Sequence, residues 1–131
     1  MKTERRVSYI ENFLSKLLTA AFGSSECVFV GTLPPTTDSD WEYMVYADVQ
    51  KMTDMTAYTT GSVLIYLYAR PSGTPARKNV TLLNKMEKKV YAAIEASDDE
   101  DYAIKVQWMN TDYDDDRNFH YNVISVKVIA R

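Results

Sequence analysis

Apolar residues near the start of the chain recur at spacings of three and four positions, which is the period of an amphipathic helix. The stripe consists of Val7, Ile10, Phe13, Leu14, Leu17, Leu18 and Ala21. Thr3 is suited to cap the start of this helix, and Gly23 is suited to end it in the left-handed conformation. The pattern therefore predicts a first helix over residues 4–22.

A second stripe with the same period follows the proline- and glycine-containing turn of residues 71–75. It consists of Val80, Leu83, Met86, Val90 and Ile94. Thr74 and Pro75 form a suitable pair for the N-cap and the first helical position. We therefore expect a second helix over residues 76–96, followed by a solvated acidic turn at residues 97–101.

The remaining apolar segments have the features of β-strands, which we expect at residues 27–33, 41–49, 58–70, 102–109 and 119–129. Residues 41–49 alternate with a period of two, so Tyr43 and Val45 face one side while Met44 and Tyr46 face the other. Residues 63–68 are apolar on both faces, which favours a central position in a sheet. Residues 50–56 and 110–118 are polar, and we interpret them as a connection and a loop.

The third of these strands is long for a small domain. Residues 58–70 would span roughly 43 Å at about 3.3 Å per extended residue. Two explanations remain open at this point: Gly61 breaks the strand with a bulge, or the hairpin between residues 41–49 and 58–70 projects beyond the body.

The predicted order of elements is α-β-β-β-α-β-β within a single domain of residues 1–131. A run of strands between two helices, closed by a strand pair, is typical of the α+β class. We expect a mainly antiparallel sheet with both helices packed on one face.

Composition narrows the possible partners. The chain has 131 residues, of which 46% are hydrophobic and 25% charged, as in ordinary globular domains. Its formal net charge is −3 and it has no strongly basic block, so nucleic acid is not expected as the main partner. The longest apolar run, Val63–Tyr68, is far shorter than the roughly 20 residues of a membrane span. The start of the chain lacks the apolar core of a signal peptide, so we expect a cytoplasmic protein that does not bind membranes.

An acidic loop is the strongest candidate for a metal site. Asp112, Asp114 and Asp116 have the alternate spacing that opens a calcium loop of the EF-hand type. However, Arg117 stands where such a loop needs glycine, and Val123 stands where it needs a bidentate glutamate. A solvated turn explains the segment better, and no metal is expected.

Catalytic residues are not evident either. His120 is the only histidine and Cys27 the only cysteine, and a dyad would need both in one cleft. Because Cys27 is followed by apolar residues, a packed structural cysteine is the better interpretation. Glycine-rich phosphate loops and the common nucleophile and zinc motifs are missing. We therefore expect neither an enzyme nor a bound cofactor.

A protein-binding surface is the remaining hypothesis. The chain has ten tyrosines, which suit both strands and interfaces. Four large side chains lie opposite the face that we expect the helices to cover, and they are Met44, Tyr46, Tyr66 and Tyr68. Either a partner covers this second face, or the sheet curls and buries both faces itself. The acidic loop adds further interface candidates, namely Asp112, Asp114, Asp115 and Asp116.

The order of these segments is similar to that of a known family. The N-terminal helix precedes the meander of Trp41–Val49 and Tyr58–Arg70, which runs through Tyr-Ala-Arg-Pro-Ser-Gly73 into the second helix. The last two strands flank Asn110-Thr-Asp-Tyr-Asp-Asp-Asp-Arg117 and end in Val123-Ile-Ser-Val-Lys-Val-Ile129. In order and length, nearly the whole chain resembles the small tail-terminator and tail-completion proteins of long-tailed bacteriophages.

The resemblance implies a structural protein of phage or prophage virion assembly. Members of that family form a ring, usually a hexamer, that ends the tail tube and joins it to the head connector. Expected partners are therefore further copies of the chain, the tail tube protein and the head-connector protein. The expected location is the host cytoplasm during assembly and the virion tail or neck afterwards.

An alternative remains a small ligand-binding or enzymatic α+β domain. Such a domain would have a cavity between the sheet and the helices. Its candidate residues are Trp41, Trp108, His120 and the acidic loop at residues 112–116.

Overall fold

The computed structural model describes residues 6–34, 41–115 and 117–131, which form two helices and a five-stranded sheet in the predicted order. The helices are α1 (Val7–Phe22) and α2 (Val80–Ala96). The strands are β1 (Val28–Val30), β2 (Tyr43–Asp54), β3 (Thr59–Ala69), β4 (Tyr102–Asp114) and β5 (Phe119–Ala130). Their order in the sheet is β1-β2-β3-β5-β4, and every pairing except the parallel β1–β2 pair is antiparallel. The predicted α+β class and mainly antiparallel sheet are confirmed.

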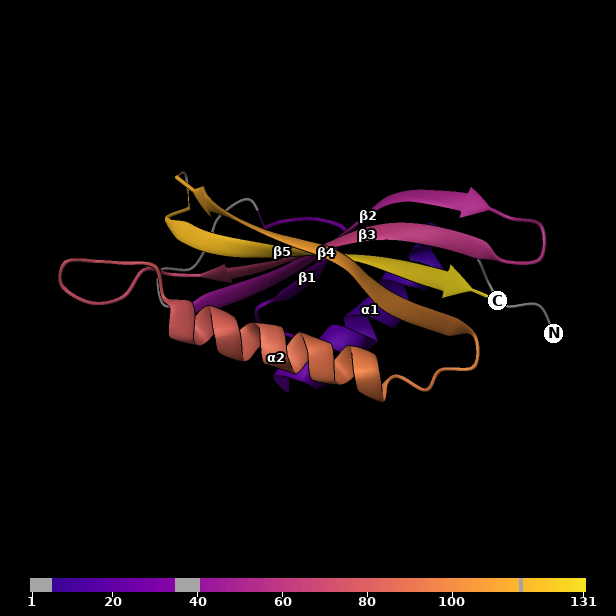
Figure 1. Cartoon of the computed structure of the whole chain (residues 1–131), viewed down its shortest axis with the longest axis horizontal. Coiled ribbons are helices and arrows are strands. Elements are labelled where there is room, and N and C mark those ends of the chain that lie inside the picture. Colours follow the sequence, from indigo (N-terminus) through magenta and orange to yellow (C-terminus); the bar gives the residue numbers. More distant parts are fainter. Residues whose placement is uncertain (1–5, 35–40, 116) are drawn as a thin grey trace.

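Both helices lie on one face of the sheet, as predicted (Figure 1). The stripes along α1 and α2 bury their apolar side chains against alternate residues of the strands, because alternate residues of a strand point to the same face. The fully or almost fully buried side chains of this main core include Ile10, Leu14, Leu18, Val63, Ile65, Leu67, Leu83, Met86, Val90, Ile124 and Val126.

The helix ends differ from the predicted ones at their N-termini. Arg6 occupies the N-cap of α1 without a side-chain cap, while Thr3 lies outside the described residues. Gly23 ends α1 with a left-handed φ of 72°, as predicted. Because α2 begins at Val80, the predicted start at residue 76 is wrong.

The turn before α2 has a structure of its own. Ser72 and Arg77 exchange two backbone hydrogen bonds of 2.8 Å, which closes a small loop over residues 72–77. The N-cap is Asn79, whose side chain accepts a hydrogen bond from the Leu82 backbone N–H at 3.1 Å. The expected capping pair of Thr74 and Pro75 is therefore wrong, since both residues belong to the loop.

Two polar segments that the pattern indicates as loops are strand instead. β2 continues to Asp54, which pairs with Thr59, and β4 continues to Asp114, which pairs with Phe119. Pairing with a neighbouring strand extends both segments although their own residues are mainly polar, because β-structure depends strongly on context.

Neither explanation for the long third strand holds. Gly61 pairs regularly with Met52 and Val128, and the irregularities fall in β2 after Val49 and in β4 after Val106. The hairpin also does not project from the sheet, since β5 accompanies β3 along its whole length. β3 is long because β5, which is also a long strand, pairs with it over all of its residues.

The central position of β3 leads to a stability prediction. Ile65→Ala should lower the free energy of unfolding by about 2–5 kcal/mol, because it leaves a cavity in the main core. The change would be measured by urea unfolding with circular dichroism. Leu64→Ala is the matched control, since Leu64 is the neighbouring residue on the opposite face and is only half-buried. Equal losses from both variants would contradict this account of the core.

Candidate functional site

The face of the sheet that points away from the helices, here called the open face, has a row of tyrosines across its three central strands. In register, Tyr46 of β2 lies opposite Tyr66 of β3, and Tyr68 of β3 lies opposite Tyr121 of β5. These four residues form the tyrosine cluster. Because paired residues share a face, the strand pairing alone brings the four rings together.

The rings of the tyrosine cluster are in direct contact. Tyr46 and Tyr66 stack with centroids 5.5 Å apart and planes inclined by 20°. Tyr66 also contacts Tyr68 at 6.0 Å and Tyr121 at 5.8 Å, and Tyr68 contacts Tyr121 at 5.1 Å. These separations lie in the range of favourable aromatic pairs, which stabilise by about 0.5–1.5 kcal/mol each beyond their buried area.

Part of the open face is a second, smaller core. Met44 and Phe119 are 0% exposed and Tyr68 is 4% exposed. The side chains packed against them include Phe29 of β1 and Leu33 and Trp41 from the segments that flank residues 35–40. The structure therefore buries Met44 and Tyr68, two of the four predicted interface residues of this face, inside the chain. Tyr46 and Tyr66 remain half-exposed.

Two arginines hold the cover of this second core in place. Arg70 donates from Nε to the Trp41 carbonyl at 2.8 Å and from Nη1 to the Arg117 carbonyl at 3.2 Å, and its guanidinium lies 4.3 Å from the centre of the Phe119 ring. Arg117 donates to the Pro34 carbonyl at 3.3 Å and pairs with Asp114 at 3.4 Å. The segment around Trp41 and the β4–β5 turn are thus fastened to each other.

Burial raises the pKa of every hydroxyl in the tyrosine cluster above its ordinary value. Nearby carboxylates add to this effect: Asp48 acts on Tyr46 and Tyr66, Asp112 on Tyr121, and Asp114 on Tyr68. The shift is large for Tyr68, the most buried of the four. The neutral phenol is the favoured form of all four side chains, so their hydroxyls remain hydrogen-bond donors on this face.

The outer strand β4 presents the largest exposed apolar side chains of the described sheet. Trp108 is 51% exposed, Met109 is 45% exposed and Tyr113 is 39% exposed. β4 is 13 residues long and pairs on one side only, with β5. An edge strand has outward-facing backbone N–H and C=O groups that can pair with a further strand. On β4 two of these N–H groups, those of Thr111 and Tyr113, donate to the side chains of Asn110 and Asp112 at 2.8 Å. Ile104 and Val106 point to the helices, but the register irregularity after Val106 places Trp108 on the open face, opposite Ser125.

The acidic residues lie at the tip of the β4–β5 hairpin. Asp112 and Asp115 are exposed, while Asp114 accepts a hydrogen bond from the Arg117 backbone N–H at 3.1 Å. Asp116 lies outside the described residues. Within the described ranges, no group of three or more acidic, histidine or cysteine side chains is placed to hold a metal ion.

The residues considered for catalysis or ligand binding do not converge. Cys27 precedes β1 and His120 lies on β5, so three strand spacings, about 14 Å, separate their strands. His120 lies on the helix side against Tyr113, with ring centroids 4.6 Å apart. Trp41 packs on Phe29 in the second core near the β4–β5 turn, whereas Trp108 lies opposite Ser125, six residues along β5 from Phe119. These positions do not form one cavity.

Comparison with known proteins finds no family model and no curated protein that matches this sequence. Neither described helix combines the length and apolar character that a membrane crossing requires. The functional assignment therefore depends on the surfaces of the molecule.

The raised tyrosine pKa values predict a loss of stability at alkaline pH. Above pH 10 the tyrosines of the unfolded chain ionise while those of the cluster stay protonated, so the unfolded state binds fewer protons and stability falls as pH rises. Below pH 10 both states are protonated and the effect vanishes. Tyr68→Phe should flatten the decline of melting temperature between pH 9 and pH 11.

Tyr9→Phe is the control for this experiment, because it removes one hydroxyl from a ring that is 40% exposed on α1. Thermal unfolding followed by circular dichroism gives the melting temperatures, and absorbance near 295 nm follows ionisation directly. An alkaline decline of equal steepness in the parent chain and in Tyr68→Phe would show that the cluster is not responsible.

Proposed function

We propose that this chain is a structural assembly protein of a phage or prophage tail, which acts by binding copies of itself and neighbouring virion proteins. In this proposal it forms a ring at the end of the tail, and the resemblance described above implies that the ring is a hexamer. The ring terminates the tube and joins it to the head connector. Assembly takes place in the host cytoplasm, and the ring ends in the virion tail or neck.

The observation that carries the proposal is the β4 edge. It combines the free side of an edge strand with three large exposed side chains, Trp108, Met109 and Tyr113. Exposed aromatic and methionine side chains are enriched at protein interfaces, and an edge strand can add a strand from another chain. A contact of this edge with a different surface of the next copy would be head-to-tail, and a head-to-tail contact closes into a ring when its rotation allows.

The exposed part of the tyrosine cluster supports a second contact in the same proposal. Tyr46, Tyr66 and Tyr121 combine half-exposed rings with neutral hydroxyls. Tyrosine contributes a large rigid contact area and a hydrogen bond at little cost in conformational entropy. The proposal assigns this surface to the tail tube or head-connector protein, leaving β4 for contacts within the ring.

The β4 edge can be tested by introducing charge. The double variant Trp108→Glu and Met109→Lys should convert the assembled protein into monomers, because both changes put charged groups where an apolar contact would exclude water. Light scattering coupled to gel filtration and native mass spectrometry would measure the change. Val80→Glu is the matched control, since Val80 is 63% exposed but lies on α2.

The outcome that would count against the proposal is also clear. A parent chain that is strictly monomeric at all concentrations, and that does not bind isolated tail tubes, has no ring-forming function. If the double variant and Val80→Glu both assembled like the parent chain, the ring contact would lie elsewhere than β4.

A further inference from the structure

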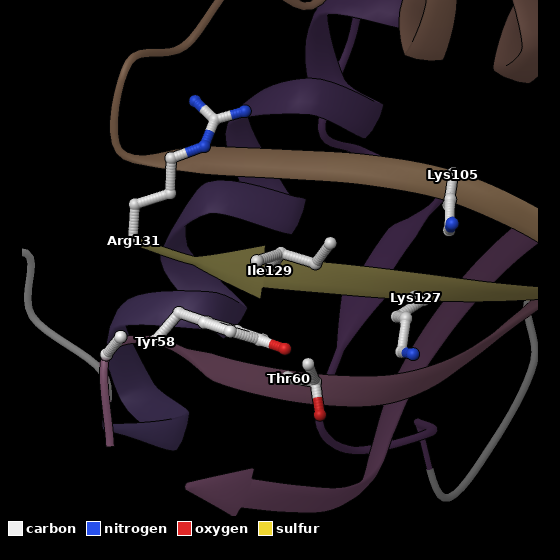
Figure 2. A pocket seen from close by; sticks show the side chains of 7 residues that line it. Tyr58, Thr60, Lys105, Lys127, Ile129 and Arg131 are labelled. Carbon is white, nitrogen blue, oxygen red and sulfur yellow. The ribbon is translucent and has the colours of Figure 1, made fainter. Parts of the chain in front are cut away.

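A pocket of about 520 Å³ lies on the open face, at the end of the sheet remote from the acidic tip of the β4–β5 hairpin (Figure 2). Its walls come from three strands and from the β2–β3 turn. The residues of this basic pocket are Ala57, Tyr58, Thr60, Lys105, Lys127, Ile129 and Arg131. Three of its seven side chains are cationic, and none is acidic.

Strand pairing forces two of the cations together. Lys105 of β4 lies directly opposite Lys127 of β5 in the register, and both point to the open face because Val126 and Val128 point to the helices. Figure 2 shows the two side chains extending from neighbouring strands. Like charges in directly opposed positions destabilise a sheet. An anion bound between the two ammonium groups would therefore reduce their repulsion and stabilise the sheet.

The described part of the chain provides no anion for these two lysines. Among the described residues, no hydrogen bond or ion pair engages the ammonium group of Lys105 or Lys127. The acidic turn before β4 lies nearby, but the Asp99 carboxylate accepts from the backbone N–H groups of Asp101 and Tyr102. Arg131, which borders that turn, donates from Nη1 to the Glu100 carbonyl at 3.0 Å.

Exposed carboxylates, whose charge is opposite to that of the two lysines, lie at the other end of the β4–β5 hairpin. Asp112 and Asp115 are exposed there, and the cations beside them are already engaged: Arg117 pairs with Asp114, and Lys78 donates to Thr111 at 2.7 Å. Lys105 and Asp112 are seven residues apart on one strand, on the order of 23 Å at about 3.3 Å per residue. A stiff hairpin therefore cannot bring its two ends together within one molecule.

We propose that the basic pocket is a carboxylate-binding site that receives the acidic β4–β5 hairpin tip, Asp112 and Asp115, of a second copy of this chain. The inference rests on the proposed function and identifies the receiving surface of the ring contact. The contact is head-to-tail, because the tip of one copy meets the opposite end of the next. The hydroxyls of Tyr58 and Thr60 supply further donors to the carboxylates, and Ile129 supplies an apolar wall.

A charge exchange in trans tests the pairing. Variant one carries Lys105→Glu and Lys127→Glu, and variant two carries Asp112→Lys and Asp115→Lys. Each alone should associate roughly 100-fold more weakly than the parent chain, because like charges then meet at the contact. An equimolar mixture should assemble again, since each tip then faces a pocket of opposite charge. Analytical ultracentrifugation measures all three association constants.

The matched control is Lys85→Glu with Lys88→Glu, the same change of charge on exposed positions of α2. It should assemble like the parent chain. If variants one and two assembled normally, or if their mixture failed to recover, the proposed pairing would be overturned while the ring itself could stand.

A binding measurement separates this inference from the proposed function. A peptide of residues 108–118 is titrated into the full-length Trp108→Glu and Met109→Lys variant, or into the parent chain if that is a monomer, and amide resonances are followed by NMR. Shifts of the backbone amides at positions 105 and 127 support the pocket even without a ring, provided that the amides at the same positions do not shift when both lysines are replaced by glutamate. If inorganic phosphate shifts these resonances and the peptide does not, or if neither does, the second copy is not the occupant.

Discussion

The rest of the structure depends on β3 being paired along both of its edges and buried beneath the helices on one face. β2 and β5 pair with it over its full length, the helices cover one of its faces, and the smaller core covers one end of the other face. Ile65 and Leu67 enter the core beneath the helices, while Tyr68 enters the smaller core of the open face. Because a central strand has every backbone group paired and its side chains packed on both faces, it fixes the register of its neighbours. The positions of the tyrosine cluster, the basic pocket and the acidic tip all follow from that register.

The two faces of the sheet meet different physical demands, which explains their different residues. The helices exclude water from one face, so it is filled mainly by aliphatic side chains such as Ile65 and Ile124. The described residues outside the sheet cover only one end of the other face, through Leu33 and Trp41. A face that is partly dry and partly wet is suited to tyrosine, whose ring is buried while its hydroxyl reaches water.

Much of the fold could be predicted from local patterns, because periodicity reports which side of an element is buried. The stripes of the helices and the alternation in residues 41–49 identified the elements and their buried faces correctly. The errors fall where a distant partner overrides local preference. Residues 110–114 are polar and exposed, yet they are strand because the apolar strand β5 extends beside them. Likewise Asn79 rather than Thr74 caps α2, because the Ser72–Arg77 pairing closes the loop before it.

The candidate surfaces were harder to predict, because a side chain is exposed only where no other part of the chain covers it, and local patterns do not show what covers a residue. Alternation placed Tyr46 and Tyr66 correctly on the face away from the helices, but it could not reveal that the segment around Trp41 covers Met44. Exposure of Trp108 depends on β4 being the outermost strand and on the bulge after Val106. Lys105 meets Lys127 because two strands pair in this register, and the pattern of neither strand alone indicates that contact. Strand order and register are non-local properties, so the residues that we assign to binding emerge only once the sheet is assembled.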